Sequence, residues 1–265
     1  MLLEIVKTIV KFFRLSGIDF IKIVNTARGL PSFIRDYIKL KKENNQELFP
    51  VELYPILDDK YKQGGTATGH YFHQDLVVAK KIYHANPSTH MDIGSRVDGF
   101  IAHLAVFRKV VIIDIREMTS STENIEFLQA NMIEMRDELK ESCDSLSSLH
   151  ALEHFGLGRY GDPIDVHGHL KGFNNMYSIL KENGVFYFSV PIGRQRIEFN
   201  AHRVFSLKYL LEMFEGKFEI VDFSFVDDKG ELNENIVLTD ELIESNCACH
   251  YGCGIFELRK KSKND

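Results

Sequence analysis

The sequence lacks several features that mark whole classes of protein. Its 265 residues include no tryptophan, only 6 prolines and only 4 cysteines, and 44% of them are hydrophobic. So few cysteines exclude a disulfide scaffold, and this hydrophobic share excludes a disordered chain. No run approaches the roughly 20 apolar residues of a membrane span, and the start lacks a signal peptide's small-residue cleavage site. We therefore expect a globular protein of a reducing cytoplasm.

Charge is unevenly distributed along the chain. The net charge is −6, yet residues 1–50 hold nine Lys or Arg against five Asp or Glu, a net +4 that leaves −10 for the other 215 residues. An acidic chain is poorly suited to neutralise phosphates, so we expect no nucleic-acid partner. This asymmetry predicts a basic arm over residues 1–50 and a second domain over residues 51–265.

The basic arm has the pattern of amphipathic helices. A 3.6-residue apolar period predicts a helix over residues 2–14 that stops at Gly17, and a second helical stretch leads through Gly29 and Pro31 into Ser32–Lys42. Such an arm packs on its own domain, forms a homodimer interface, or lies on an anionic membrane surface. The last alternative would place the protein at the inner face of a membrane.

Beyond the arm, short apolar segments alternate with helical ones. We expect strands at His90–Ile93, Val110–Ile115, Ile125–Leu128, Ser145–Leu149, Gly184–Val190, Phe218–Val226 and Gly254–Lys260. We expect helices at Phe72–Tyr83, Gly99–Phe107, Leu170–Glu182 and Ser206–Phe214. This alternation predicts an α/β fold with a doubly wound, mostly parallel sheet, in which ligands bind beyond the carboxyl ends of the strands.

Residues typical of a nucleoside site follow the first two strands. The first strand runs into the turn DIGSRVDG (92–99), and Asp114 closes the second strand twenty residues after Gly94, where such folds place a carboxylate on ribose hydroxyls. A dinucleotide site requires GxGxxG, but Arg96 and Val97 stand where the second glycine and its neighbour would fall. The loop therefore favours S-adenosylmethionine, which has no phosphates.

The third and fourth strands also end in polar residues. Gln129 and Asn131 follow the third strand, at a place suited to contact an adenine edge. The fourth is followed by a loop rich in glycine and charge, which is typical of an active site. We expect no bound metal. The spacing of ligands in known metal sites is matched neither by the CACHYGC segment (247–253) nor by the acidic and histidine residues of 162–169.

The sequence resembles the class I S-adenosylmethionine-dependent methyltransferases, and more narrowly the domain-of-unknown-function family numbered 268, which occurs among bacterial surface-polysaccharide genes and in nematodes. The resemblance covers roughly residues 65–260. Its motifs are GHYFHQDLVVAKKI (69–82), HMDIGSRVDGFIAHL (90–104), IDIR (113–116), SSLHALEHFGLGRYGDPID (147–165), FSVPIG (188–193), FNAHRVFS (199–206) and YGCGIFELRK (251–260).

The resemblance implies a Rossmann-like methyltransferase sheet with an antiparallel last strand, and S-adenosylmethionine as cofactor. It implies an O-methyltransferase acting on a sugar or nucleotide-sugar precursor of a surface polysaccharide such as a capsule. The expected cofactor-binding residues are Tyr71, Asp92, Gly94, Ser95, Arg96, Asp114, Gln129 and Asn131. The expected substrate-binding residues are Arg159, Tyr160, Asp162, Asn200 and Arg203.

A hydroxyl acceptor requires a base, and histidine titrates near neutral pH. His154, beside Glu153 after the fourth strand, is the expected base, and His202 is the alternative. Two other functions stay open: a methyltransferase-like scaffold without activity, and a nicotinamide-dependent sugar oxidoreductase or epimerase. The latter usually has a Tyr-x-x-x-Lys pair, and Tyr177 and Lys181 show that spacing without a partner serine that we can place.

Overall fold

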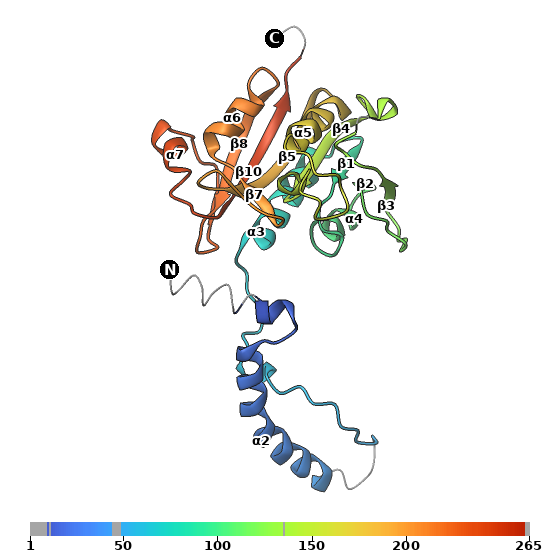
Figure 1. Cartoon of the computed structure of the whole chain (residues 1–265). Coiled ribbons are helices and arrows are strands. Elements are labelled where there is room, and N and C mark those ends of the chain that lie inside the picture. Colours follow the sequence, from blue (N-terminus) through green and yellow to red (C-terminus); the bar gives the residue numbers. More distant parts are fainter. Residues whose placement is uncertain (1–9, 11, 44–48, 135, 263–265) are drawn as a thin grey trace. The chain divides into compact units, whose positions relative to one another are not determined.

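The computed structural model describes residues 10, 12–43, 49–134 and 136–262 (Figure 1). The chain divides into two compact units, Met1–Thr66 and Ala67–Asp265. The division falls after Thr66, beyond the boundary at residue 50 that the charge pattern suggests.

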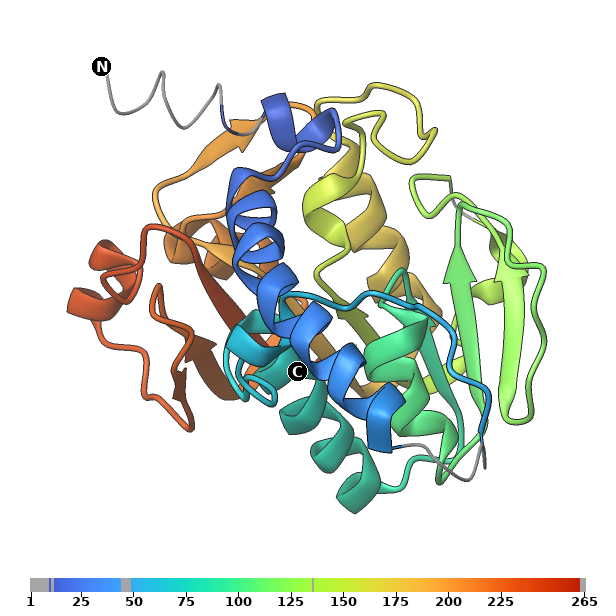
Figure 2. The ribbon, with the colours of Figure 1, turned by 90° about the horizontal axis from the view of Figure 1, so that it is seen from below.

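The first unit is built around one long helix, α2 (Phe20–Glu43), which is unbroken in both views (Figures 1 and 2). The helical stretch expected to lead through Gly29 and Pro31 into Ser32–Lys42 is one continuous helix. A Cβ on Gly29 would lie 1.9 Å from the carbonyl oxygen of Leu57, so this glycine serves close packing and does not end the helix. The helix predicted over residues 2–14 lies largely outside the described residues.

The polar contacts of the first unit hold α2 to the segment that follows it. Lys60, in the short helix η1 (Asp59–Tyr61), forms an ion pair with Asp36, and the Tyr61 hydroxyl donates to the carbonyl of Arg28. Large apolar side chains on α2 stay substantially exposed, namely Phe20, Ile21, Ile23, Val24, Leu30, Ile34, Ile38 and Leu40. None of the described helices combines the length and the apolar character needed to cross a membrane.

The second unit is an α/β domain. Its helical elements are α3 (His70–Ala85), η2 (Val97–Ile101), α4 (Ala102–Ala105), η3 (Asp137–Leu139), η4 (Leu152–His154), α5 (Gly168–Ile179), α6 (Leu207–Phe214) and α7 (Asp240–Ser245). Its strands are β1 (His90–Ile93), β2 (Val110–Asp114), β3 (Ile125–Gln129), β4 (Cys143–Leu149), β5 (Leu180–Ile192), β6 (Arg196–Glu198), β7 (His202–Val204), β8 (Phe218–Val226), β9 (Leu232–Asn233) and β10 (Gly252–Lys260).

The central sheet has the strand order β3-β2-β1-β4-β5-β10-β8-β9. The strands from β3 to β5 are parallel, while β10 runs antiparallel between β5 and β8. The predicted doubly wound, Rossmann-like sheet with an antiparallel last strand is confirmed. Because β1 lies between β2 and β4, the carboxyl ends of these three strands meet at one edge.

Apolar layers cover both faces of this sheet. On one face, α5 and α6 pack against a core that includes Phe173, Phe186 and Phe188 (Figure 1). On the other face, α3 and the η2–α4 segment pack against β2 and β10 through residues such as Ile82 and Phe100. The domain is therefore a three-layer α/β/α sandwich, as the alternation of strands and helices predicts.

Several element boundaries differ from the sequence prediction by a few residues. The helix expected at Leu170–Glu182 ends at Ile179, and β5 begins at Leu180 because that residue pairs with Cys143 of β4. The helix expected from Gly99 begins earlier, with the π-helical turn η2. A Cβ on Gly99 would lie 2.7 Å from the Asp75 carboxylate of α3, so this residue marks a close approach inside the element.

Candidate functional site

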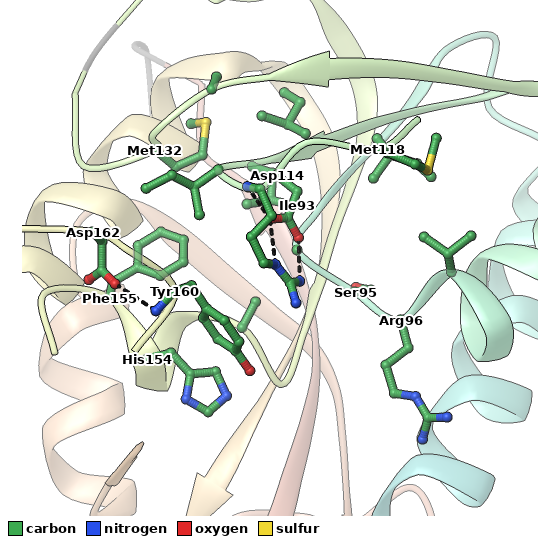
Figure 3. A pocket seen from close by; sticks show the side chains of 18 of the residues that line it. Ile93, Ser95, Arg96, Asp114, Met118, Met132, His154, Phe155, Tyr160 and Asp162 are labelled. Atoms are coloured by element: carbon green, nitrogen blue, oxygen red, sulfur yellow. Dashed lines mark hydrogen bonds and ion pairs between the residues drawn. The ribbon is translucent and has the colours of Figure 1, made fainter. Parts of the chain in front are cut away.

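A cavity of about 490 Å³ opens at the carboxyl ends of β1, β2 and β4 (Figure 3). Its volume falls in the usual range for small-molecule sites, about 300–1,000 Å³. Its lining includes ten of the residues that the sequence places in a site: Tyr71, Gly94, Ser95, Arg96, Asp114, Asn131, His154, Arg159, Tyr160 and Asp162. The position is that expected for a ligand site in a doubly wound sheet.

The turn after β1 is built on a buried carboxylate. Gly94 has φ +71°, and a Cβ there would lie 3.0 Å from the Ala151 Cβ, so both conformation and space favour glycine. Beneath it, the fully buried Asp92 accepts hydrogen bonds from the backbone and hydroxyl of Ser95 and from the Ser147 hydroxyl. Burial raises the pKa of Asp92 to about 6, although these hydrogen bonds oppose the shift. Asp92 thus shapes the turn from behind the cavity.

Asp114 at the end of β2 presents its carboxylate in the cavity, where it is held by a neighbouring cation. The Arg116 guanidinium donates to both Asp114 oxygens, at 3.0 and 2.7 Å, and its backbone N–H donates at 2.8 Å (Figure 3). The same guanidinium lies 4.4 Å from the centre of the Tyr160 ring. Arg116 therefore links Asp114 to the loop after β4.

Much of the cavity wall is apolar. Met118 and Met132 lie on either side of Asp114 in Figure 3, and Ile133 adds to the same lining. Sequence reasoning missed these residues, because isolated apolar positions in loops carry no periodic signal. Asn131 lines the cavity, but its side-chain oxygen accepts from the backbone N–H of Ile133. Gln129 lies outside the lining and donates to the carbonyl of Ile115.

His154 is oriented for proton acceptance at Nε2. Its Nδ1 lies 2.7 Å from the carbonyl oxygen of Ala201, so Nδ1 carries the proton and donates, which leaves the lone pair on Nε2. Burial lowers the pKa of His154, and the nearby Glu153 carboxylate only partly opposes that shift. The ring is therefore neutral at pH 7.

The remaining predicted residues divide into two groups. Arg159 and Tyr160 lie on the cavity wall, and Arg159 donates to the carbonyl of Ala201. Asp162 also lines it, while its carboxylate accepts from the backbone N–H of Gly156 and thereby shapes the loop. Arg203 is buried outside the lining and donates to backbone carbonyls of the loop after β4.

His202 and Asn200 belong to the β6–β7 hairpin, outside the cavity lining. The His202 ring packs 5.1 Å from the ring of Tyr251, and its Nε2 lies 3.5 Å from a Glu198 oxygen. Glu153 is fully buried behind the cavity and contacts the His150 ring at 2.8 Å. His150 lines the cavity and was missed as a site residue, although its position directly after the fourth strand could have singled it out.

Among the residues that the structure describes, no cluster of metal ligands includes residues 162–169, Cys247 or Cys249. Asp165 pairs with Lys171, and His169 is bonded to the Tyr209 hydroxyl at 2.7 Å. Cys247 and Cys249 are buried free thiols in the core beside α6. Burial raises the pKa of Cys247 to about 11, which suits an apolar packing role.

Comparison with known proteins places the chain in a family. The family model described as "Caenorhabditis protein of unknown function, DUF268" matches residues 98–260, and the chain belongs to this family. No functionally curated protein matches the sequence.

Solved structures show what the fold resembles. One is the 1,6-didemethyltoxoflavin-N1-methyltransferase of Burkholderia thailandensis, solved with S-adenosylhomocysteine, at 17% identity and a TM-score of 0.50 over 71% of this chain and 79% of that chain. Another is the N-methyltransferase NodS of Bradyrhizobium japonicum WM9, also with S-adenosylhomocysteine, at 13% identity and a TM-score of 0.50 over 73% and 89%. The domain thus has the fold of S-adenosylmethionine-dependent methyltransferases.

Proposed function

We propose that the α/β domain is an S-adenosylmethionine-dependent methyltransferase that methylates a hydroxyl group. One observation carries this proposal: the Gly94 turn and the Asp114 carboxylate face a single cavity at the carboxyl ends of adjacent parallel strands. Solved proteins that share the fold contain S-adenosylhomocysteine, the demethylated cofactor.

The cavity suits this cofactor chemically. The Asp114 carboxylate can accept from two ribose hydroxyls once Arg116 turns away from it, and Met118, Met132 and Ile133 offer an apolar surface to an adenine ring. The absence of a second glycine after Gly94 disfavours a pyrophosphate but not a sulfonium cofactor. When bound, the cofactor supplies an electrophilic methyl group.

His154 is the proposed general base. Its Nε2 lone pair can take the proton from an acceptor hydroxyl as the oxygen attacks the methyl carbon, while the Ala201 carbonyl fixes the ring. The neutral state that burial favours is the state such a base needs at pH 7. Positioning of the acceptor supplies most of the remaining rate.

The acceptor is proposed to be a sugar or sugar-derived molecule. Tyr160 offers an aromatic surface on the cavity wall, and the Arg159 guanidinium lies 5.1 Å from the centre of that ring. A hydroxyl-rich ring and an anionic substituent suit these two groups. The role in a bacterial surface polysaccharide stays a prediction from the resemblance, since the matching family is described for Caenorhabditis.

Calorimetric titration with S-adenosylmethionine and S-adenosylhomocysteine tests the cofactor. We expect micromolar binding, and we expect Asp114→Asn to weaken it at least tenfold. Glu126→Gln is the matched control, because Glu126 is a β3 carboxylate outside the cavity that pairs with Lys109. Binding of neither ligand would support the scaffold alternative, and binding of a nicotinamide dinucleotide instead would support the oxidoreductase.

Substitution of the histidines tests the base. With a panel of sugar and nucleotide-sugar acceptors, His154→Gln should abolish formation of S-adenosylhomocysteine while leaving cofactor affinity unchanged. His202→Gln is the comparison, because His202 lies outside the cavity lining. Near-normal turnover of the His154 variant and loss in the His202 variant would transfer the role to His202.

A further inference from the structure

Three metal-binding side chains from distant parts of the chain meet beside the cavity. His70 is the first residue of α3, His150 directly follows β4, and Cys253 is the second residue of β10. One ligand atom from each lies within 4.8 Å of those of the other two. His150 and Cys253 are buried, and the rings of His70 and His150 are stacked with an interplanar angle of 15°.

His150 is arranged as a metal ligand would be. It is 7% exposed, and its Nδ1 lies 2.8 Å from a Glu153 oxygen. Its buried Nε2 has no hydrogen-bond partner of conventional geometry among the described residues, although the Cys253 thiol is close enough to interact with it. A histidine that bonds a carboxylate through one nitrogen and offers the other is the usual arrangement around zinc.

We propose that His70, His150 and Cys253 bind a divalent transition-metal ion of the zinc type. Tetrahedral bonds of about 2.1 Å to nitrogen and about 2.3 Å to sulfur place those ligand atoms about 3.5 Å apart. To reach that spacing, the ligand atoms, which lie within 4.8 Å of one another, must approach by up to about 1.3 Å. The stacked His70 and His150 rings must also turn, because an imidazole lone pair lies in the plane of its ring. On binding, the Sγ–H bond of Cys253 breaks, an Sγ–metal bond forms, and the proton leaves to solvent.

Loss of the thiol proton does not leave the neighbouring Gln74 side-chain oxygen without a hydrogen-bond donor. The Cys253 Sγ now lies 3.6 Å from the side-chain oxygen of Gln74, and that oxygen also accepts from the Ser189 hydroxyl at 2.6 Å. Gln74 therefore keeps a donor when the thiol becomes a thiolate. Three protein ligands leave a fourth position for water or substrate, as in catalytic zinc sites. Because His150 also lines the cavity, the ion would lie at its wall.

Cobalt(II) titration of the full-length, reduced, metal-free protein tests this site without any methyl-transfer assay. We expect one equivalent to produce a thiolate-to-cobalt charge-transfer absorption that zinc(II) abolishes by displacement. Cys253→Ser should remove the absorption. Cys249→Ser should leave it unchanged, because Cys249 is another buried thiol of the same segment but lies outside the cluster.

Two further variants keep the test decisive if Cys253→Ser does not fold. His70 is only half-buried, so His70→Gln should fold and bind zinc at least tenfold more weakly. Glu153→Gln should cost about 10–100-fold in affinity through the His150 ring. Absence of the absorption in the folded wild-type protein, or its persistence in both Cys253→Ser and His70→Gln, would overturn the proposal. Cofactor binding is measured separately, so failure of one proposal leaves the other standing.

Discussion

The buried Asp92 carboxylate should make the stability of the α/β domain depend on pH in a direction opposite to that of most carboxylates. Its pKa rises from an ordinary 3.8 to about 6 in the folded state, because burial disfavours the charge. A group whose folded pKa is raised stabilises the protein fully below its unfolded pKa, and that contribution is lost as pH rises through the folded value. For Asp92 the loss falls mainly between pH 4 and pH 7.

The magnitude follows from the two pKa values. At pH 5, one unit below the folded pKa, the folded state gains about a factor of ten from protonation, or about 1 kcal/mol relative to pH 8. The variant Asp92→Asn lacks this contribution. Its free energy of unfolding, relative to wild type, should therefore rise by about 1 kcal/mol between pH 5 and pH 8.

Urea unfolding followed by far-ultraviolet circular dichroism measures this difference, since the chain has no tryptophan to report by fluorescence. Asp98→Asn is the control, because Asp98 is an exposed carboxylate of the same loop whose pKa is lowered by its hydrogen bond to Arg96. If the free energy of unfolding of Asp92→Asn, taken relative to wild type, stays constant or decreases between pH 5 and pH 8, the reasoning is refuted.

Three other substitutions test the packing. Phe173→Ala should destabilise the domain by about 3–5 kcal/mol in urea unfolding, because its ring is 1% exposed and contacts four other phenylalanines. Gly29→Ala should speed proteolysis within the first unit, because its Cβ would strike the backbone of Leu57, whereas Gly64→Ala, in open space, should not. Lys81→Met should lower the free energy of unfolding by about 1–3 kcal/mol, because Asp222 of β8 and Glu257 of β10 would lose the cation that pairs with both. An unchanged midpoint in urea unfolding would contradict this expectation.

Local sequence patterns were sufficient to predict the central strands. Residues 110–113 of β2 are a continuous apolar run, and a run of that kind is typical of a strand covered on both faces. The periodicity failed at Leu180, where a segment of good helical character becomes strand because β4 offers it a partner. Only the structure explains why glycine stands at position 29 inside α2, because a Cβ there would strike the backbone of Leu57.

For the candidate site, too, the sequence determined some features and the tertiary structure decided others. The sequence by itself determined which polar residues follow the strands, and therefore that Gly94, Asp114 and His154 share one edge of the sheet. Side-chain direction was decided only by the tertiary structure, which turns Arg203 onto backbone carbonyls outside the cavity lining.

The proposed metal-binding cluster is the feature that depends most on the tertiary structure. His70, His150 and Cys253 are separated by 80 and 103 residues, and no spacing rule connects them. They meet because β10 inserts antiparallel between β5 and β8, so its first residues reach the edge where β4 ends and α3 begins. The identity of each residue is local information, but the distance between two side chains depends on how every intervening strand is ordered in the sheet.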